Sequence, residues 1–320
     1  MKKFKALVLF FALLSTQSLQ ATNPVKPAKD PFLVTGYLNS SWVKPTTDLE
    51  FIKYLDRIFF FGLSPDSEGR FTVSDAYIKN YELVRSKMNK NQKILLVVGG
   101  GGLVANMHVM GDNPEKRELF VKELVAFAKK YKFDGIDMDW ETDWKSKPAK
   151  KVSTENLIAL LTSIKGQMPK NSILTAALGG SSGQQATDIS GLVEDVSVML
   201  YSTLNKEGLH APLYTVKERL ENYTKSNYPN NRLLIGVPFY GRHADRRTQK
   251  YYQFADKLAG NQVISIYDGF SFNSAEVMRE KVRYFKEAGY KGIMIWELTQ
   301  DVPYSNPMSL LRAIYEEAKK

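Results

Sequence analysis

The feature that most restricts the fold of this 320-residue chain is a regular alternation of two kinds of segment. Short runs of β-branched, aliphatic and aromatic residues alternate with longer stretches in which apolar residues recur every three or four positions. The short runs predict strands and the longer stretches predict helices. We expect eight strands, at residues 32–38, 57–63, 93–99, 135–141, 172–178, 196–202, 233–240 and 292–298. We expect helices at residues 74–90, 113–131, 153–168, 212–224, 274–288 and 307–319.

Strands that alternate with helices indicate an α/β fold, built from right-handed β–α–β units around a parallel sheet. Eight such units in about 290 residues match the size of a closed (β/α)₈ barrel, the TIM-barrel architecture. An open, doubly wound sheet is the alternative that the pattern leaves. No internal repeat and no low-complexity tract interrupts the alternation, so we expect a single domain over residues 32–320.

The N-terminal segment has the pattern of a signal peptide. Lys2, Lys3 and Lys5 precede an unbroken apolar run over residues 6–14, and small or polar residues follow as far as Ala21. We expect residues 1–21 to be removed and the mature protein to be secreted or periplasmic. A short uncleaved anchor is the alternative, although the apolar run is far below the roughly 20 residues that cross a bilayer. Residues 22–31 contain three prolines and are expected to form a linker.

The composition excludes several classes of function. The chain has no cysteine, which rules out disulfides, thiolate nucleophiles and cysteine-based metal sites. Its net charge of +10 would fall to +7 without the signal peptide, and the surplus is spread along the chain rather than clustered with aromatic residues. We therefore expect no nucleic-acid partner. We also expect no metal, no cofactor, no membrane contact after signal cleavage, and a monomer.

Residues 133–141 are the most informative segment, with the sequence Phe-Asp-Gly-Ile-Asp-Met-Asp-Trp-Glu. Side chains two positions apart in a strand share a face, so Asp137, Asp139 and Glu141 should point the same way. The large apolar residues between them should pack outward against helices. In a barrel, the acidic face then turns toward the axis and the C-terminal mouth, where (β/α)₈ enzymes carry their active sites. Asp134 is out of phase with this face and is expected to be structural.

Three carboxyls that share one inward face repel each other and lose hydration, which raises the pKa of at least one of them. A carboxyl that keeps its proton near neutral pH can serve as a general acid. Two alternatives remain at this point. A solvated acidic edge fits poorly with large apolar neighbours. A calcium loop would need turn residues and glycine between its ligands rather than Met138 and Trp140. We therefore favour catalysis.

The octapeptide DGIDMDWE at residues 134–141 resembles the DxxDxDxE signature of glycoside hydrolase family 18, the chitinase and endo-β-N-acetylglucosaminidase family. The chain also resembles the family's first, third, sixth, seventh and eighth strands, at residues 34–37, 94–100, 199–201, 236–242 and 292–297. These stretches follow the family's order and cover about residues 33–300.

The resemblance implies cleavage of β-1,4 bonds after N-acetylglucosamine with retention of configuration. In this family the acetamido oxygen of the substrate is the nucleophile, an exception to the usual pair of carboxylates. Glu141 would protonate the leaving oxygen. Asp139 would hydrogen-bond the acetamido N–H, and Asp137 would share a proton with Asp139.

The resemblance also assigns roles to residues on other strands. Tyr201 would donate to the acetamido carbonyl, Trp296 would lie beneath the reacting sugar, and Tyr37 would support the inner aspartate. Further substrate contacts are expected from Gly100, Met199, Tyr240, Arg242 and Trp144. The partner implied is an oligo- or polysaccharide that contains N-acetylglucosamine.

The chain departs from the family at three points. Val97 replaces a serine of the third strand, and Ser202 replaces an aspartate that follows the sixth-strand tyrosine. Both changes remove a polar partner near the aspartate pair. Only about 50 residues separate Arg242 from Gly292. We therefore expect no small α+β domain between the seventh and eighth strands, and an open cleft that suits endo cleavage.

Four alternatives stay open at the level of sequence. The substrate could be an N-glycan or peptidoglycan rather than chitin, because loop shape decides that choice. The protein could bind glycans without hydrolysing them. Ser181 lies in a G-x-S-x-G match at residues 179–183, which would suit an acyl hydrolase but is better explained as a loop.

The three histidines fall in expected loops and are predicted to lie at the surface: His108, His210 and His243.

Overall fold

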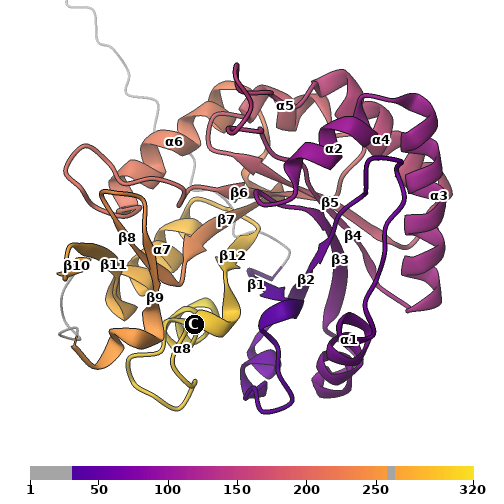
Figure 1. The fold of residues 1–320 in the computed structure, drawn as a ribbon. Coiled ribbons are helices and arrows are strands. Elements are labelled where there is room, and N and C mark those ends of the chain that lie inside the picture. The colour runs from indigo at the N-terminus through magenta and orange to yellow at the C-terminus, as the bar shows by residue number, and fades with distance from the viewer. Residues whose placement is uncertain (1–30, 258–263) are drawn as a thin grey trace, which may run out of the picture.

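A closed barrel of eight parallel strands forms the centre of the molecule, as the computed structural model of residues 31–257 and 264–320 shows (Figure 1). The barrel order is β1-β12-β7-β6-β5-β4-β3-β2, and β12 pairs with both β1 and β7 to close it. The predicted barrel is confirmed and the open sheet is excluded. The strands are β1 Leu33–Asn39, β2 Arg57–Leu63, β3 Lys93–Gly99, β4 Gly135–Asp139, β5 Ile173–Gly179, β6 Asp195–Met199, β7 Leu233–Pro238 and β12 Gly292–Trp296.

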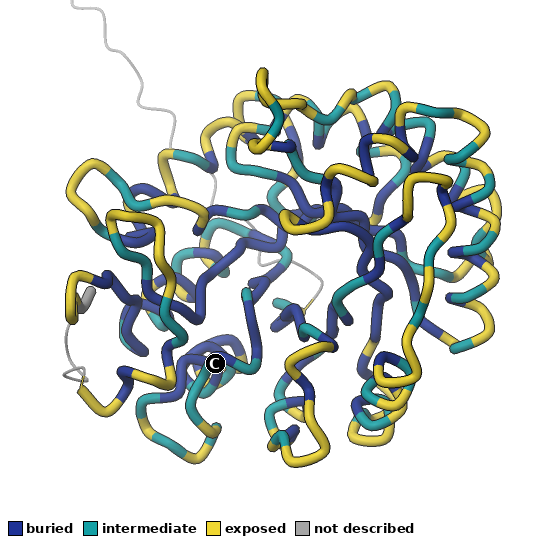
Figure 2. Tube along the Cα trace, viewed as in Figure 1, coloured by how far each residue is buried: buried dark blue, intermediate teal, exposed yellow. Residues whose placement is uncertain are grey.

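Helices surround the barrel, and their outward faces are exposed while the strands are mostly buried (Figure 2). Six of them match the predicted helices: α1 Asp75–Lys87, α3 Pro114–Lys130, α4 Thr154–Gln167, α6 Leu213–Lys225, α7 Ala275–Glu287 and α8 Leu310–Ala318. The start of α3 illustrates the cause, because the Asn113 side chain accepts from the Lys116 N–H and Pro114 fills the first helical position. The helices α2 Val104–Gly111 and α5 Gly183–Asp188 were not predicted, since both are too short to show a periodic pattern.

A small antiparallel sheet lies between β7 and α7. Its strands pair in the order β10-β11-β8-β9. They are β8 Tyr240–His243, β9 Thr248–Lys250, β10 Ile264–Tyr267 and β11 Phe270–Asn273. The seventh predicted strand ran to Tyr240, whereas β7 ends at Pro238 and Tyr240 begins β8. The predicted absence of an α+β domain holds: among the described residues of this segment, the sheet is accompanied only by two short 3₁₀ helices.

The predicted two faces of the acidic strand are present in β4. Asp137 lies in register with Thr175 on β5, and both side chains point into the barrel, where they are hydrogen-bonded. Ile136 and Met138 are buried on the opposite face. Trp140 packs against α2, where a side chain in place of the hydrogen of Gly111 would lie 2.0 Å from the indole ring. The strand itself ends at Asp139, so Glu141 belongs to the segment that follows it.

The predictions for the signal peptide and for all but the last residue of the linker concern residues 1–30, which lie outside the described part of the chain. Across residues 31–257 and 264–320, none of the helices combines the length and the apolar character that a membrane crossing requires.

Candidate active site

Asp137 lies deepest of the three acids and is fully buried. The Tyr37 hydroxyl donates to its Oδ2 at 2.6 Å, and the Thr175 hydroxyl donates to its Oδ1 at 2.6 Å. Burial raises the pKa of Asp137 to about 6, while the hydrogen bonds from Thr175 and Tyr37 act in the opposite direction. Each oxygen of this carboxyl is therefore held by a hydroxyl from a neighbouring part of the barrel wall.

Asp139 has the least support of the three acids. Its side chain is 4% exposed, and its Oδ1 has no hydrogen-bond partner among the described residues. Burial raises the pKa of Asp139 well above its usual value, and the neighbouring Glu141 and Asp137 raise it further. A buried carboxyl between two other acids keeps its proton to a higher pH than an exposed aspartate does.

Glu141 lies two residues beyond the end of β4 and is half-buried. Burial raises its pKa, and a hydrogen bond from the main-chain N–H of Gly101 acts in the opposite direction. The glycines at the end of β3 and directly after it make this approach possible. At Gly99 the φ angle is +101°, and a Cβ there would lie 2.2 Å from the Asp139 carbonyl oxygen. At Gly101 a Cβ would lie 3.1 Å from Glu141 Oε1, so a side chain would crowd the acid.

Tyr201 lies two residues beyond the end of β6 and is buried beside the acids. Its pKa is raised well above the usual value, first by burial and then by Tyr240 and the three carboxyls. The phenol is therefore a neutral donor. Its hydroxyl makes a weak contact of 3.8 Å with Met294 Sδ. Gly236 on β7 leaves space for the ring, because a Cβ there would lie 2.6 Å from it.

Trp296, the last residue of β12, is half-buried in an aromatic cluster at the same end of the barrel. Its ring centroid lies 5.5 Å from those of Tyr37 and Phe61. Tyr37 also stacks on Phe59 at 4.7 Å. Because the Tyr37 hydroxyl reaches Asp137, one side chain joins the aromatic cluster to the acids. The structure thus brings together the predicted acids, Tyr37, Tyr201 and Trp296.

The other predicted contacts have varied surroundings, and their role toward a sugar stays a prediction. Gly100 lies against Phe61, and Met199 is half-buried at the end of β6. The Tyr240 hydroxyl donates to the Tyr201 main-chain oxygen at 2.9 Å. Arg242, on β8, is half-buried and hydrogen-bonded to Tyr240. Trp144, in the loop after β4, is 76% exposed.

Sequence reasoning missed two supporting residues. Thr175 holds Asp137, and its register with Asp137 could have revealed it once the strands were aligned. Val97 is also in register with Asp137, so the hydroxyl that is absent there is supplied by Thr175 on the other side. Glu297 follows Trp296 and is fully buried. It accepts from Asn39 N and from Thr299 N, both at 3.0 Å, and burial raises its pKa to about 7.

The surface prediction for the histidines was wrong for two of the three. His108 is 2% exposed and His210 is fully buried, whereas His243 is half-buried on β8. The prediction failed because His108 lies on the buried side of α2, and the small antiparallel sheet covers His210. Asp134 is structural, as predicted: its carboxylate accepts from Ile94 N at 2.9 Å and pairs with Arg85.

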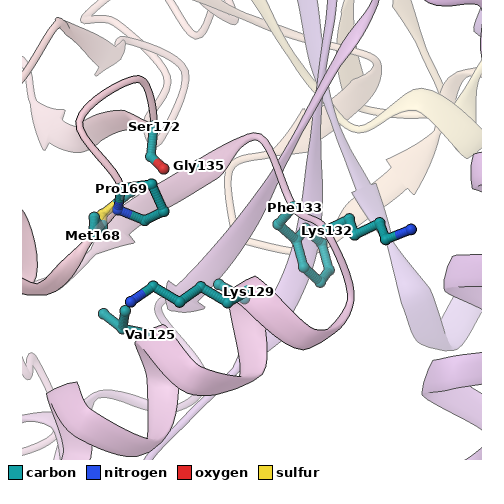
Figure 3. A pocket seen from close by; sticks show the side chains of 9 residues that line it. Val125, Lys129, Lys132, Phe133, Gly135, Met168, Pro169 and Ser172 are labelled. Carbon is teal, nitrogen blue, oxygen red and sulfur yellow. The ribbon is translucent and has the colours of Figure 1, made fainter.

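A cavity of about 190 Å³ lies at the opposite end of β4, lined among others by Lys129, Phe133 and Pro169 (Figure 3). Gly135, the first residue of β4, also lines it, so the cavity is remote from the carboxyls. The Lys129 ammonium group already donates to the Gln167 carbonyl. Within the described part of the chain, no group of three or more histidine, aspartate or glutamate side chains is arranged to hold a metal ion.

Comparison with known proteins places these residues in context. The family model for glycosyl hydrolases family 18 matches residues 33–301. The chain is 23% identical over 271 residues to endochitinase 1 of Metarhizium anisopliae, covering 67% of this chain and 63% of that protein. It is 26% identical over 269 residues to chitinase A1 of Niallia circulans, covering 72% of this chain and 38% of that protein. The match therefore spans less than two thirds of either relative.

The crystal structure of the GH18 chitinase ChiB from the chitin utilization locus of Flavobacterium johnsoniae resembles this fold with a TM-score of 0.75 at 25% identity. The likeness covers 90% of this chain and 94% of that one. The matched region includes the whole barrel, since the family model begins at the first residue of β1 and ends five residues beyond the last residue of β12.

Proposed function

Because the chain belongs to family 18 of the glycosyl hydrolases, we propose that it is a glycosidase that cleaves β-1,4 bonds of N-acetylglucosamine polymers in a chitinase-like manner. One observation carries the proposal: three carboxyls meet a phenol and an indole at the C-terminal mouth of the barrel, and the buried Asp139 has an Oδ1 without a hydrogen-bond partner among the described residues. The chitinase names of the matched relatives support the choice of substrate.

Glu141 is the proposed general acid. It is the most exposed of the three acids, so a glycosidic oxygen can reach it, and its raised pKa keeps it protonated to a higher pH than an exposed glutamate. A group that must give up a proton near neutral pH works best when its pKa is close to the working pH. The N–H of Gly101 then stabilises the carboxylate that proton transfer leaves.

Asp139 and Tyr201 are the proposed orienting groups. The substrate's own acetamide is the nucleophile in this proposal, and an intramolecular attack depends above all on geometry. Tyr201 is a neutral donor that suits the acetamido carbonyl, and Asp139 has a free oxygen that suits the acetamido N–H. Asp137 can take up the proton that Asp139 must release, since burial raises its pKa to about 6, and the hydroxyls of Tyr37 and Thr175 hold its carboxyl in place.

Two features support an exported, endo-acting enzyme. The basic and apolar pattern of residues 1–21 supports export, either to a periplasm or to the medium. The segment between β7 and β12 is short, which supports a cleft open along its length rather than a tunnel that holds a chain end. A glycan-binding protein without turnover is the alternative, suggested by Val97 and Ser202. The Thr175 hydroxyl on Asp137 weighs against it.

Hydrolysis of fluorogenic chitobiose and chitotriose conjugates by wild type and by Glu141→Gln tests the proposal. We expect the variant to lose about 10²- to 10⁴-fold in kcat, as for the removal of a general acid. Glu82→Gln, at an exposed position of α1, is the matched control and should retain full activity. Equal turnover by Glu141→Gln would contradict its role. Tight oligosaccharide binding without turnover from about pH 4 to 9 would instead support the glycan-binding alternative.

Product analysis defines the substrate and the mode of cleavage. Chitin, a high-mannose glycoprotein and peptidoglycan are digested side by side, and the products are followed by mass spectrometry from the first minutes. Oligomers of mixed length from chitin at early times would support endo cleavage, whereas a single short product would contradict it. A β-linked glucose dimer with the same fluorophore lacks the acetamide. Its hydrolysis at a comparable rate would contradict participation of the substrate.

A further inference from the structure

The catalytic groups Glu141 and Tyr201 occupy equivalent places in their strands. Glu141 lies two residues past the end of β4, and Tyr201 lies two residues past the end of β6. The hydrogen bonds of the barrel ladder therefore stop before either residue. Some other contact must fix the main chain at these two positions, because a displacement of about 1 Å can reduce turnover by up to 10²-fold.

Two buried histidines make that contact. His210 Nε2 lies 2.8 Å from the Tyr201 main-chain oxygen, and His108 Nε2 lies 3.2 Å from the Glu141 main-chain oxygen. A carbonyl oxygen only accepts, so the hydrogen of each imidazole is on Nε2. The Nδ1 atoms of both rings are buried and have no partner among the described residues. Each imidazole thus directs its hydrogen to the main chain of a proposed catalytic residue.

His210 is itself held firmly by the small sheet. Its main-chain N–H donates to Ser271 Oγ at 3.0 Å, and its carbonyl accepts from Asn273 Nδ2 at 2.7 Å. Lys281 on α7 is fully buried and donates to Asn273 Oδ1 at 2.6 Å. The Tyr240 hydroxyl is a second donor to the same Tyr201 oxygen. A chain of buried hydrogen bonds therefore runs from α7 through β11 to the end of β6.

His108 occupies the corresponding place beside β4. It lies on α2, and its ring packs edge-on with that of Trp140, with the two ring centroids 5.4 Å apart. Trp140 precedes Glu141 and packs against the same helix. The helix α2 thus supports both the residue before the proposed acid and the main-chain oxygen of the acid itself.

Both rings are neutral. Burial lowers the pKa of His210 to about 4, and Lys281 and Arg242 also lower it, while the main chain of Tyr201 and of Tyr240 opposes the shift. Burial also lowers the pKa of His108, to which Lys150 adds, while its hydrogen bond to Glu141 and the acids Asp112 and Asp143 oppose the shift. A neutral ring can keep one hydrogen on Nε2 and none on Nδ1.

We propose that His210 and His108 are positioning residues that fix the main chain of Tyr201 and of Glu141 through their Nε2–H groups. The proposal rests on the function proposed above, because it takes Glu141 as the acid and Tyr201 as the acetamide donor. Neither histidine touches the reacting atoms. Each acts by keeping a side chain that lies beyond the strand ladder in its reactive place.

Pairs of near-isosteric substitutions test the proposal, because glutamine keeps a donor near the Nε2 position and methionine does not. The variants are His210→Gln, His210→Met, His108→Gln and His108→Met, with His243→Met as the control at the third histidine. Steady-state kinetics are measured on a soluble chitotriose conjugate well below the lowest Tm of the set. We expect each methionine variant to lose about 10- to 100-fold in kcat with KM within about threefold of wild type. Each glutamine variant should recover most of the loss, and the control should match wild type.

Opposite results would overturn the proposal. Methionine variants with wild-type kcat would show that the donors are not needed, and glutamine variants as slow as the methionine variants would show that packing rather than donation matters. If a methionine variant does not fold, the glutamine variant decides: turnover near wild type supports the proposal, and a loss as large as about 10-fold overturns it.

Nitrogen NMR gives a readout that does not depend on turnover. With three histidines in the chain, long-range ¹⁵N–¹H spectra recorded near neutral pH should show two imidazoles with hydrogen on Nε2 alone. A hydrogen on Nδ1 in either ring would overturn the proposal for that histidine. If wild type cleaved no glycan, the proposed function would fail, and these spectra would still decide whether the two rings hold the two carbonyls.

Discussion

Carboxyl groups are buried at both ends of the barrel interior, but only at one end are they paired with cations. Toward the N-terminal ends of the strands, Asp195 is fully buried and accepts from Arg57 through both oxygens at 2.9 Å, while Lys291 pairs with it at 2.9 Å. Toward the C-terminal ends lie Asp137, Asp139 and Glu141. In the described part of the chain, no lysine, arginine or histidine lies within ion-pair distance of any of the three.

The comparison separates burial from function. A buried charge is usually paired with an opposite charge, and Asp195 follows that rule. Hydroxyls hold Asp137, a main-chain N–H holds Glu141, and Asp139 Oδ1 has no hydrogen-bond partner in the described part of the chain. Burial raises the pKa of each of the three acids. A carboxyl without a cation is available for proton transfer, whereas one that is locked between Arg57 and Lys291 is not. The missing cations, rather than burial, mark the candidate active site.

The largest expected effect is on turnover, and it arises at the C-terminal end of the barrel, here called the uncompensated end because its three acids have no cation partner among the described residues. Asp139→Asn should lower kcat by about 10²- to 10⁴-fold, since an amide can neither carry the shared proton nor accept with both atoms. Its Tm should be equal to or above that of wild type, because the substitution removes a desolvated acid. Kinetics and calorimetry on the same preparation check both parts. A large fall in Tm would contradict the view that Asp139 contributes nothing to stability.

Removing the buried acid at the N-terminal end of the barrel should instead lower stability and leave turnover unchanged. Asp195→Asn leaves Arg57 and Lys291 without their shared anion, and breaking a buried ion pair costs about 3–5 kcal/mol in the free energy of unfolding. Turnover per folded molecule should stay close to that of wild type, because Asp195 is at the other end of the barrel. Urea unfolding and active-site titration measure the two quantities. A large loss of kcat with unchanged stability would break the contrast between the two ends.

The contrast also explains what could be predicted from the sequence. The eight barrel strands follow from local sequence patterns. The direction of Asp137 and Asp139 does too, because polar and apolar residues alternate within the five residues of β4. Asp195 was not singled out, since its partner Arg57 is 138 positions away and only the closed barrel brings the two together. Thr175 was missed for the same reason: its contact with Asp137 depends on strand register, which no local pattern encodes.

The small sheet and the burial of His108 and His210 could not be predicted from the sequence for a different reason. The strands β8 to β11 have three or four residues each, too few to show an alternation. Whether His210 is buried depends on that sheet, and whether His108 is buried depends on α2, an eight-residue helix with no clear periodicity. Residues in short segments become buried through tertiary contacts alone, so the default assignment to the surface failed there.

Titration of Asp137 at the uncompensated end should make the protein less stable as the pH rises. Burial raises the pKa of Asp137 to about 6, so the folded protein keeps this proton while the unfolded chain releases it near pH 4. The contribution of Asp137 to stability is thus greatest below about pH 4 and falls as the pH rises to about 6.

Asp137→Asn should therefore flatten the fall in unfolding free energy over that window. The difference from wild type should accumulate to at most about 3 kcal/mol between pH 4 and 6. Other acids with raised pKa values, such as Glu297 and Asp301, contribute equally to both proteins and cancel in the comparison. Urea unfolding of both proteins at intervals of half a pH unit measures it. Parallel curves would mean that Asp137 titrates in the folded protein as it does in the unfolded chain.

The smallest expected effect concerns a new hydroxyl placed on either face of one strand. Val97 and Val98 on β3 are both fully buried, but Val97 lies in register with Asp137 and points into the barrel, whereas Val98 lies in register with Met138 on the opposite face. Threonine has nearly the shape of valine, so each substitution chiefly adds a hydroxyl.

Val97→Thr should cost less than about 1 kcal/mol of unfolding free energy, because the Asp137 carboxylate can accept a third hydrogen bond. Val98→Thr should cost about 1–3 kcal/mol, because its hydroxyl would be buried among apolar side chains. A third donor to the Asp137 anion should also move the acidic limb of the pH–rate profile to lower pH in Val97→Thr alone, since it favours the ionised form. Urea unfolding and pH–rate profiles of the pair measure both effects. Equal losses of stability would mean that the barrel interior beside Asp137 accepts a polar group no better than the apolar layer beneath the helices.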